Sequence, residues 1–442
     1  MLKKVLRYSY IAIIVCFMVL ENLSVVLAAD EEVLSITLKN AIIMAIKASE
    51  DVQTKDNEIA RSNSQMRGEK SELFPHVSTS ASWSQNYEYP DISATALANE
   101  YDFNAGITLE QKLFTFGRIS SSILATREKI KVNQWNKKAS EQEIIYITKF
   151  AYYNVYLKKQ TLKIAQASYE RAQKNKDILE QRSARGRASK YDNIKIAADI
   201  ASRSPSINSA RASLNSAVQT LKRIIGVNLK KDIDITDNLA KDYHALNIEQ
   251  LTDGLNDNQP VLKALEQSIA ATEFTIREKK AEYFPEISAF STWNRKGSSA
   301  EPDLQREDSF DYGVVGLKIN LPIWSGGKRK EDLKQARIDK KNKELSLEKT
   351  SRDLSLKLDI AVGEYNEFIK TLTANEEAVR LAEETFKLSQ DLFRSGQISI
   401  TDLNDAELLL SRGKLSKENT LFNINATLAQ IEKLAVTEVA SE

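Results

Sequence analysis

The sequence predicts a mainly α-helical protein with a small β component, built from two copies of one helix–strand–strand–long helix–helix unit. Three observations lead to this prediction. The 442 residues include only 14 Gly and 7 Pro, which is few for a loop-rich globule and typical of long helices. Each half contains segments of about ten residues in which apolar and polar side chains alternate, as they do in strands. Sequence landmarks also recur at one constant spacing, since Trp293 lies 210 residues after Trp83.

The repeat keeps one register through helices, strands and turns. Residues 71–78 match residues 281–288, and each segment contains a Phe-Pro pair. Further pairs at the same spacing are Gly117 and Gly327, Gly186 and Gly396, Ser189 and Ser399, and Asp192 and Asp402. A duplicated structural unit explains this common spacing better than chance does. We expect the first copy at residues 29–239 and the second at residues 240–442.

The first residues have the pattern of an export signal. Basic residues precede the apolar run 11–20, and a small-residue cleavage site ends at Ala28. We therefore expect residues 1–28 to be removed. The alternative is an uncleaved anchor, although the apolar run is about half of the ~20 residues that cross a bilayer. Cys16 is the only cysteine, so the mature chain would contain no disulfide.

A helix should precede the strands in each half. The residue before a proline is pushed out of helical geometry, so the first helix, at residues 37–73, is expected to end at the junction marked by Pro75. Its copy, at residues 260–283, should end in the same way before Pro285. Both junctions therefore mark the passage from helix to strand.

The segments after these prolines alternate with a period of two. The predicted strands lie at about 76–89 and 101–115 in the first copy and at about 286–297 and 310–322 in the second. Strands of this length, with one apolar and one polar face, fit the wall of a transmembrane β-barrel. Four strands cannot close such a barrel and lipid does not tolerate an open edge, so several chains would have to close it together. The alternative is a small soluble sheet packed on helices.

Two very long helices follow the strands. Residues 118–184 contain neither proline nor glycine and would form a helix of roughly 100 Å. Residues 328–395 form its copy, with apolar positions in steps of four and three, as in a coiled-coil seam. A glycine ends each helix and Ser-x-x-Asp begins the next, which predicts antiparallel hairpins with tips at about 185–190 and 395–400. The tip residues are Arg185, Gly186, Arg187, Ser189, Ser395, Gly396, Gln397, Ile398 and Ser399.

Together these features resemble the TolC family of outer-membrane channel proteins. The resemblance rests on the export signal, the duplicated order of elements, the junctions at Pro75 and Pro285, and the run Leu-Pro-Ile-Trp-Ser-Gly-Gly at 321–327, and it covers nearly the whole mature chain. It implies a homotrimer in which each chain gives four strands to one twelve-stranded barrel in the outer membrane of a Gram-negative-type cell, while the helices form an α-barrel across the periplasm. Gly117 and Gly327 would then lie where strands pass into helices.

The resemblance also implies a function. Such channels are the exit duct of tripartite efflux pumps and type I secretion systems, and they dock on a periplasmic adaptor and an inner-membrane transporter. In the best-known member of the family, a glycine at the second tip is followed after six and nine positions by two aspartates that ring the periplasmic entrance. Gly396, Asp402 and Asp405 have this spacing, so six carboxylates in a trimer would favour cations. The alternative for Asp402 is a purely structural role, because a carboxylate in the first turn of a helix stabilises that helix.

Two departures from the family concern the tips. Phe393 and Ile398 occupy the positions where that best-known member has a tyrosine and an arginine that hold its closed tip, so any closed state here must be held differently. Arg185 and Arg187 make the first tip basic, which leaves the adaptor unidentified. The transported substrate and the resting state of the tip also stay open.

Other classes of function have little support. Two histidines and no mature cysteine offer little for a metal site or a nucleophile, so we expect no enzyme and no cofactor. The formal net charge of +1 does not indicate nucleic-acid binding. The main rival to the channel is a soluble periplasmic coiled-coil adaptor or scaffold, which would also have an export signal and a long hairpin. Two equivalent hairpins and two amphipathic strand pairs favour the channel.

Overall fold

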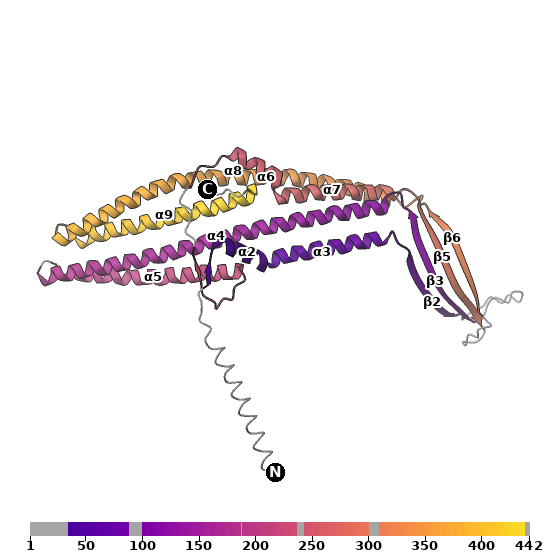
Figure 1. Cartoon of the computed structure of the whole chain (residues 1–442), viewed down its shortest axis with the longest axis horizontal. Coiled ribbons are helices and arrows are strands. Elements are labelled where there is room, and N and C mark those ends of the chain that lie inside the picture. Colours follow the sequence, from indigo (N-terminus) through magenta and orange to yellow (C-terminus); the bar gives the residue numbers. More distant parts are fainter. Residues whose placement is uncertain (1–33, 88–99, 187, 237–242, 300–308, 438–442) are drawn as a thin grey trace, which may run out of the picture. The chain divides into compact units, whose positions relative to one another are not determined.

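The computed structural model describes residues 34–87, 100–186, 188–236, 243–299 and 309–437 (Figure 1). The expected signal peptide, the loops with Pro90 and Pro302, and Arg187 lie outside the described residues. The chain divides into two compact units. We call the unit of Asp51–Ser140 and Asp253–Leu356 the sheet unit, and the unit of the described residues up to Glu50, Glu141–Thr252 and from Lys357 onward the tip unit.

The sheet unit contains one antiparallel sheet with the strand order β2-β3-β5-β6 (Figure 1). Its elements are α3 (Glu50–Ser71), β2 (His76–Gln85), β3 (Tyr101–Phe114), α7 (Pro260–Ala281), β5 (Glu286–Ser299) and β6 (Ser309–Asn320), with the first parts of α4 (Arg118–Ala184) and α8 (Lys328–Ser395). All four predicted strands are present, with ends that differ by a few residues from the expected ones.

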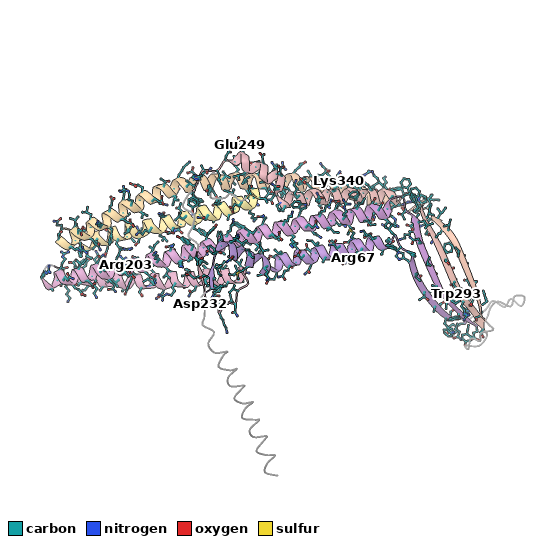
Figure 2. All side chains as sticks on the ribbon, in the orientation of Figure 1. Arg67, Arg203, Asp232, Glu249, Trp293 and Lys340 are labelled. Atoms are coloured by element: carbon teal, nitrogen blue, oxygen red, sulfur yellow. The ribbon has the colours of Figure 1, made fainter. Side chains whose placement is uncertain are left out.

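The two β-hairpins have the same register. His76 lies opposite Glu110 in the first, and Glu286 lies opposite Asn320 in the second, so both partners are shifted by the spacing of the sequence repeat. Strand β3 then joins β5 across the two copies, with Ile107 opposite Trp293, which Figure 2 labels on the sheet. The duplication that the sequence shows is therefore preserved in the pairing of individual residues.

The sheet has an apolar face and a polar face, as the alternation predicts. Val77, Trp83 and Leu317 are exposed on the first. The second carries polar side chains such as Ser80, Asn294 and Lys318. A broad exposed apolar face is unusual for a sheet in water and fits one that contacts lipid. Among the described residues, no helix is long and apolar enough to cross a membrane.

The tip unit contains the paired helices. Its elements are β1 (Leu34–Ile36), α2 (Leu38–Ala48), α5 (Lys190–Ile224), β4 (Ile233–Ile235), α6 (Ile248–Asn258) and α9 (Ile400–Ala435), with the remaining parts of α4 and α8. The two long helices begin and end where the sequence predicts. The parallel pair of β1 and β4 and the helix α6 were not predicted.

The first predicted helix is wrong as a single element. It breaks at Ser49, where ψ is 117°, and becomes α2 and α3. The copy of Ser49 is Gln259, whose ψ of 114° precedes Pro260. Proline explains this extended geometry in the second copy. The first copy has the same break with Glu50 in place of the proline, so α2 and α3 match α6 and α7.

Both hairpins of the tip unit share one core. It contains residues of four helices: Ala172 and Leu179 of α4, Ile196 and Ile200 of α5, Ala382, Phe386 and Phe393 of α8, and Ile400, Leu403, Ala406 and Leu410 of α9. Burying these side chains against one another removes apolar surface from water. The α4–α5 hairpin and the α8–α9 hairpin are therefore packed together and are not independent coiled coils.

Candidate functional site

The hairpin tips form by the same local chemistry in both copies. Gly186 and Gly396 have φ angles of 71° and 85°, a left-handed geometry that glycine adopts at little cost. At the second tip the amide of Gln397 donates to the carbonyl oxygen of Leu392 at 2.9 Å, as in a Schellman motif. The two glycines follow the ends of α4 and α8, and the chain reverses at both tips, as predicted.

The capping boxes that begin the return helices are confirmed. The Ser399 hydroxyl accepts from the amide of Asp402, and Asp402 Oδ2 accepts from the Ser399 amide at 3.0 Å and from its hydroxyl at 2.7 Å. Ser189 and Asp192 make the same box at the first tip. The hydrogen bond from the Ser399 hydroxyl is the main reason that the pKa of Asp402 lies below its usual value, so this carboxylate stays charged at neutral pH.

Asp405 lies one turn beyond Asp402 and has a different role in the fold. Both side chains are exposed. Within the described chain, no hydrogen bond or ion pair is recorded for Asp405, so its charge is available to ions. Its copy in the first hairpin, Lys195, donates from Nζ to Thr401 Oγ1 at 2.6 Å, across from α5 to α9. The two hairpins therefore carry opposite charges at equivalent positions.

The other predicted site residues fall into two groups. At the tips, Arg185, Ser395 and Gln397 are exposed, whereas Ile398 packs against the shared core. The junction residues belong to the sheet unit. Pro75 and Pro285 precede β2 and β5, while Gly117 and Gly327, with φ angles of 86° and 84°, precede α4 and α8.

A buried ion cluster that was not predicted joins the two hairpins. Glu407 of α9 has 1% of its surface exposed and accepts from two arginines of the first hairpin. Arg171 Nη2 donates to Oε1 at 2.8 Å, and Arg203 Nη1 donates to Oε2 at 2.5 Å. Ser411 also donates to Oε1 at 2.8 Å. Figure 2 labels Arg203 on α5. We call Arg171, Arg203, Glu407 and Ser411 the Glu407 cluster.

The sequence contained a signal for this cluster. In α9 the core positions are spaced by three and four residues and comprise Ile400, Leu403, Glu407 and Leu410. Glu407 therefore places a carboxylate at a position where a coiled-coil seam normally has an apolar side chain. A buried charge at such a position requires a partner. The partners lie 204 and 236 residues earlier, and spacing alone could not identify them.

A further contact joins the hairpins nearer the tips. Arg182 Nη1 of α4 donates to the carbonyl oxygen of Phe393 at 3.0 Å, and its guanidinium lies 4.7 Å from the centre of the Phe393 ring. Cation–π contacts of this kind stabilise by roughly 0.5–2 kcal/mol. With the Lys195–Thr401 bond and the Glu407 cluster, the first hairpin supplies the cations and the second supplies the acceptors.

The ion cluster predicts how the tip unit responds to acid. Burial alone would raise the pKa of Glu407, but hydrogen bonds and charge from Arg203, Ser411 and Arg171 outweigh it and hold the pKa below its usual value. A carboxylate with a depressed folded pKa stabilises above its unfolded pKa of about 4.3, and the stabilisation is lost only as the pH falls through the folded value. Hydrogen exchange in α9, corrected for intrinsic rate, is therefore expected to stay slow between about pH 7 and pH 5. Faster corrected exchange already at pH 5 would contradict this.

Glu418, also on α9, serves as the contrast for that experiment. Burial raises its pKa, so its neutral form is favoured and acidification stabilises the fold there. Lys163 and Lys417 lie close enough to oppose the shift. A Glu418→Gln variant should no longer be stabilised at this position by acidification. The dependence of α9 hydrogen exchange on pH that arises from the Glu407 cluster should be unchanged.

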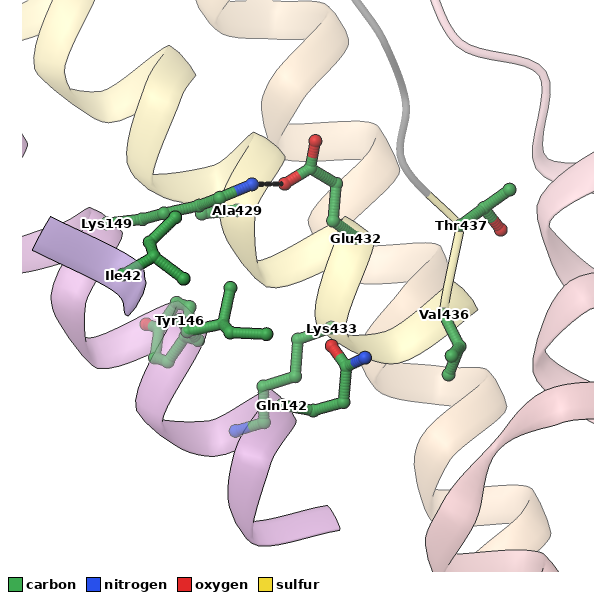
Figure 3. Close-up of a pocket in the computed structure, with 10 residues that line it drawn as sticks. Ile42, Gln142, Tyr146, Lys149, Ala429, Glu432, Lys433, Val436 and Thr437 are labelled. Atoms are coloured by element: carbon green, nitrogen blue, oxygen red, sulfur yellow. Dashed lines mark hydrogen bonds and ion pairs between the residues drawn. The ribbon is translucent and has the colours of Figure 1, made fainter. Parts of the chain in front are cut away.

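Two hollows lie within the tip unit. One, of about 500 Å³, runs between α4, α8 and α9 and is lined by charged residues that include Lys163, Glu383 and Lys414. The other, of about 200 Å³, lies beside the ion pair of Lys149 and Glu432 (Figure 3). Among the described residues, no group of three His, Cys, Asp or Glu side chains could hold a metal ion.

The sheet is amphipathic and has two open edges, and long helices connect it to the coupled hairpins. This architecture is that of a channel-forming protein whose β-barrel is completed by further copies of the chain. The chain belongs to the outer membrane efflux protein family, whose model matches residues 41–227 and 251–435. The starts of these two segments differ by the spacing of the sequence repeat, so the family model covers each copy separately.

Curated relatives agree with this family. The chain is 24% identical over 376 residues to outer membrane protein TolC of Escherichia coli K12, a match that covers 80% of this chain and 73% of TolC. It is 22% identical over 362 residues to the probable efflux pump outer membrane protein TtgC of Pseudomonas putida, covering 78% of this chain and 71% of the relative.

Solved structures share the fold. The Campylobacter jejuni CmeC outer membrane channel superposes with a TM-score of 0.76 at 15% identity, over 90% of this chain and 85% of CmeC. The open state of the Neisseria gonorrhoeae MtrE outer membrane channel superposes with a TM-score of 0.71 at 18% identity, over 90% of this chain and 88% of MtrE. The protein is an outer-membrane efflux channel that extends into the periplasm, and three copies form its β-barrel. These matches favour the channel over the soluble adaptor or scaffold.

Proposed function

We propose that the protein is the passive exit duct of a tripartite pump and that Asp402 and Asp405 set the ion preference of its periplasmic entrance. The observation that carries the proposal is the exposure of both carboxylates on one face of α9, directly after the second tip. Residues three apart on a helix are neighbours, so a trimer brings six charges to the entrance. Rings of carboxylates favour cations in pores.

The proposal gives the two aspartates unequal parts. Asp402 already accepts the hydrogen bonds of the capping box, so it has a structural role as well as a charge. Lys195 on α5 also offsets part of the electrostatic field of this carboxylate. Asp405 has no such duty. We therefore assign the larger share of the selectivity to Asp405.

The partners are also part of the proposal. An adaptor in the periplasm and a transporter in the inner membrane would deliver cargo, with the exposed tips as the docking surface. Arg185 at the first tip and the aspartates at the second would meet the adaptor with opposite charges. Relatives named for antibiotic and toluene efflux support small molecules as cargo, and the expected type I secretion role remains an alternative. We propose no catalytic role.

Single-channel recording in a planar bilayer under a salt gradient tests the entrance. The wild-type protein is expected to prefer cations, and Asp405→Asn to lower the cation-to-anion permeability ratio by roughly two- to fivefold. Asp402→Asn should lower it less, because Lys195 already offsets part of the Asp402 charge. The double variant should show the largest loss.

Asp192→Asn is the matched control, because Asp192 caps the first hairpin as Asp402 caps the second. This variant should leave the selectivity unchanged. An unaltered permeability ratio in the double variant would refute the role of the aspartates. Failure of the purified protein to insert as a conducting trimer under all lipid conditions would refute the duct itself.

A further inference from the structure

The polar face of the sheet has an apolar exception on strand β6. Phe310, Tyr312 and Val314 alternate along this strand, so they lie on one face, and Leu317 lies on the other. All three are exposed, by 60%, 41% and 43% respectively. Their partners on β5 are the polar residues Lys296, Asn294 and Thr292.

Phe290 of β5 continues this apolar row. It lies opposite Gly316, the next residue of β6 on the same face. A Cβ on Gly316 would be 2.9 Å from two atoms of the Phe290 ring, so the ring occupies the space where a side chain of residue 316 would lie. At the other end, the rings of Phe310 and Tyr312 are 6.0 Å apart. We call Phe290, Phe310, Tyr312 and Val314 the apolar stripe.

The first copy of the repeat has no such stripe. The residues equivalent to Phe290, Phe310, Tyr312 and Val314 are Ser80, Glu100, Asp102 and Asn104. Because the two hairpins have the same register, strand pairing does not require apolar side chains at these positions. The stripe is therefore a property of the second hairpin that the shared fold does not explain.

The stripe lies on the side of the sheet that faces away from lipid. The opposite face, with Trp83 and Leu317, contacts the membrane, and the second face of the strands in such a barrel lines a polar, water-filled interior. Contiguous apolar surface exposed to water commonly marks a binding site. The molecules that reach this surface are those that travel through the barrel.

The charges around the stripe indicate what kind of molecule it suits. On the same face of β3, β5 and β6, the charged residues are Asp102, Glu110, Lys112, Glu286, Lys296 and Lys318. Acidic and basic side chains are equally represented, so this face has no excess charge to select an ion. The stripe itself offers aromatic rings, against which another ring can stack.

We propose that the apolar stripe binds small uncharged aromatic molecules as they pass through the barrel. This inference rests on the proposed function as an exit duct and adds a class of cargo and a contact site near the extracellular end. Three chains would place three stripes around the interior, where bound cargo would hinder the flow of ions.

Blocking of single channels by 2-naphthol in a planar bilayer tests the inference, because this probe is aromatic and uncharged at neutral pH. Added on the extracellular side, it is expected to interrupt the ion current of the wild-type channel. Decahydro-2-naphthol has the same two fused rings in saturated form. It should need an at least about threefold higher concentration for half block, because it cannot stack as an aromatic ring does.

The variant Phe310→Gln with Tyr312→Asn and Val314→Asn gives β6 the uncharged counterparts of the first copy. Its half-blocking concentration of 2-naphthol should rise at least about tenfold, while its conductance in salt alone should stay near that of the wild type. Val315→Thr is the matched control, since Val315 follows Val314 on the lipid face. It should leave the block unchanged, which also excludes an effect of the probe on the bilayer.

A second variant covers failure of the first to assemble. Phe310→Leu with Tyr312→Leu keeps the stripe apolar and removes two of its rings. This variant should lose the preference for 2-naphthol over the saturated analogue. An unchanged preference would overturn the aromatic contact.

The outcomes separate this inference from the proposed function. A wild-type channel that conducts but is not blocked by 2-naphthol would overturn the stripe as a binding site and leave the duct intact. So would equal block of the wild type and the polar variant. If the wild-type chain never forms a conducting trimer, the duct itself fails.

Discussion

Replacing Glu407 by glutamine is expected to reduce the stability of the tip unit by about 3–5 kcal/mol, because breaking a buried ion pair leaves uncompensated charge. Arg171 and Arg203 would both remain largely buried, with side chains only 19% and 14% exposed. Their mutual repulsion would then act within the first hairpin, and α9 would lose the carboxylate that binds both arginines to the second hairpin. The α8–α9 hairpin should separate more readily from α4 and α5, and conductance should rise if this contact narrows the entrance.

Hydrogen exchange in α9 measures this loss directly. Protection around residues 400–411 should fall, while protection near the end of α9, around residues 425–435, should change little. Glu418→Gln is the control, since Glu418 shares the helix but has no arginine partner in the part of the chain that the structure describes. Equal protection in Glu407→Gln and the wild type would show that the cluster does not hold the hairpins together.

A second variant set distinguishes lost charge from lost packing. Changing Arg171 and Arg203 to methionine together with Glu407→Leu replaces the ions by apolar side chains of similar size. Such replacements are often neutral or stabilising. The triple variant is therefore expected to recover most of the protection that Glu407→Gln loses.

Gly226→Ala is expected to destabilise the tip unit by about 2–5 kcal/mol, through backbone strain and overpacking together. Gly226 ends α5 with a φ of 69°, and an added Cβ would lie 2.5 Å from the Cβ of Ala48 in α2. Ala48 belongs to a helix that packs in the core of the β1–β4 pair. The clash would therefore push α2 away from the end of α5.

Gly186→Ala provides the matched control, since Gly186 has a φ of 71° and no atom within 4 Å of an added Cβ. It should cost only the strain of the left-handed geometry, roughly 1–2 kcal/mol. Urea unfolding of the detergent-solubilised protein, followed by circular dichroism, measures both variants. Equal losses in the two would show that packing against Ala48 contributes nothing.

Local signals explain most of what the sequence predicted. The glycine and proline positions located the ends of α4 and α8, and Ser189 and Ser399 with their aspartates gave the capping boxes. The break at Ser49 escaped prediction because the proline that marks it in the second copy is absent from the first. The short strands β1 and β4 show no period, and each pairs with a segment far away in the sequence, as Leu34 does with Ile233.

The site was predicted less completely than the fold. The spacing of Asp402 and Asp405 after Gly396 was visible, and so was the capping role of Asp402. The contact of Arg182 with Phe393 and the Glu407 cluster depend on which faces of two hairpins meet. Which faces meet depends on the tertiary structure and leaves no local pattern in the sequence. The one local signal was Glu407, a carboxylate at a core position of an otherwise apolar helix face.

The identical registers of β2–β3 and β5–β6 have a consequence for symmetry. Each half of the sheet is an equivalent unit, so three chains bring six equivalent hairpins to the barrel wall. The tips do not follow this sixfold equivalence, because the first hairpin has Lys195 at the position where the second hairpin has Asp405. A partner with six identical arms would therefore meet two kinds of tip in alternation, and only three of its arms could make the same ionic contact.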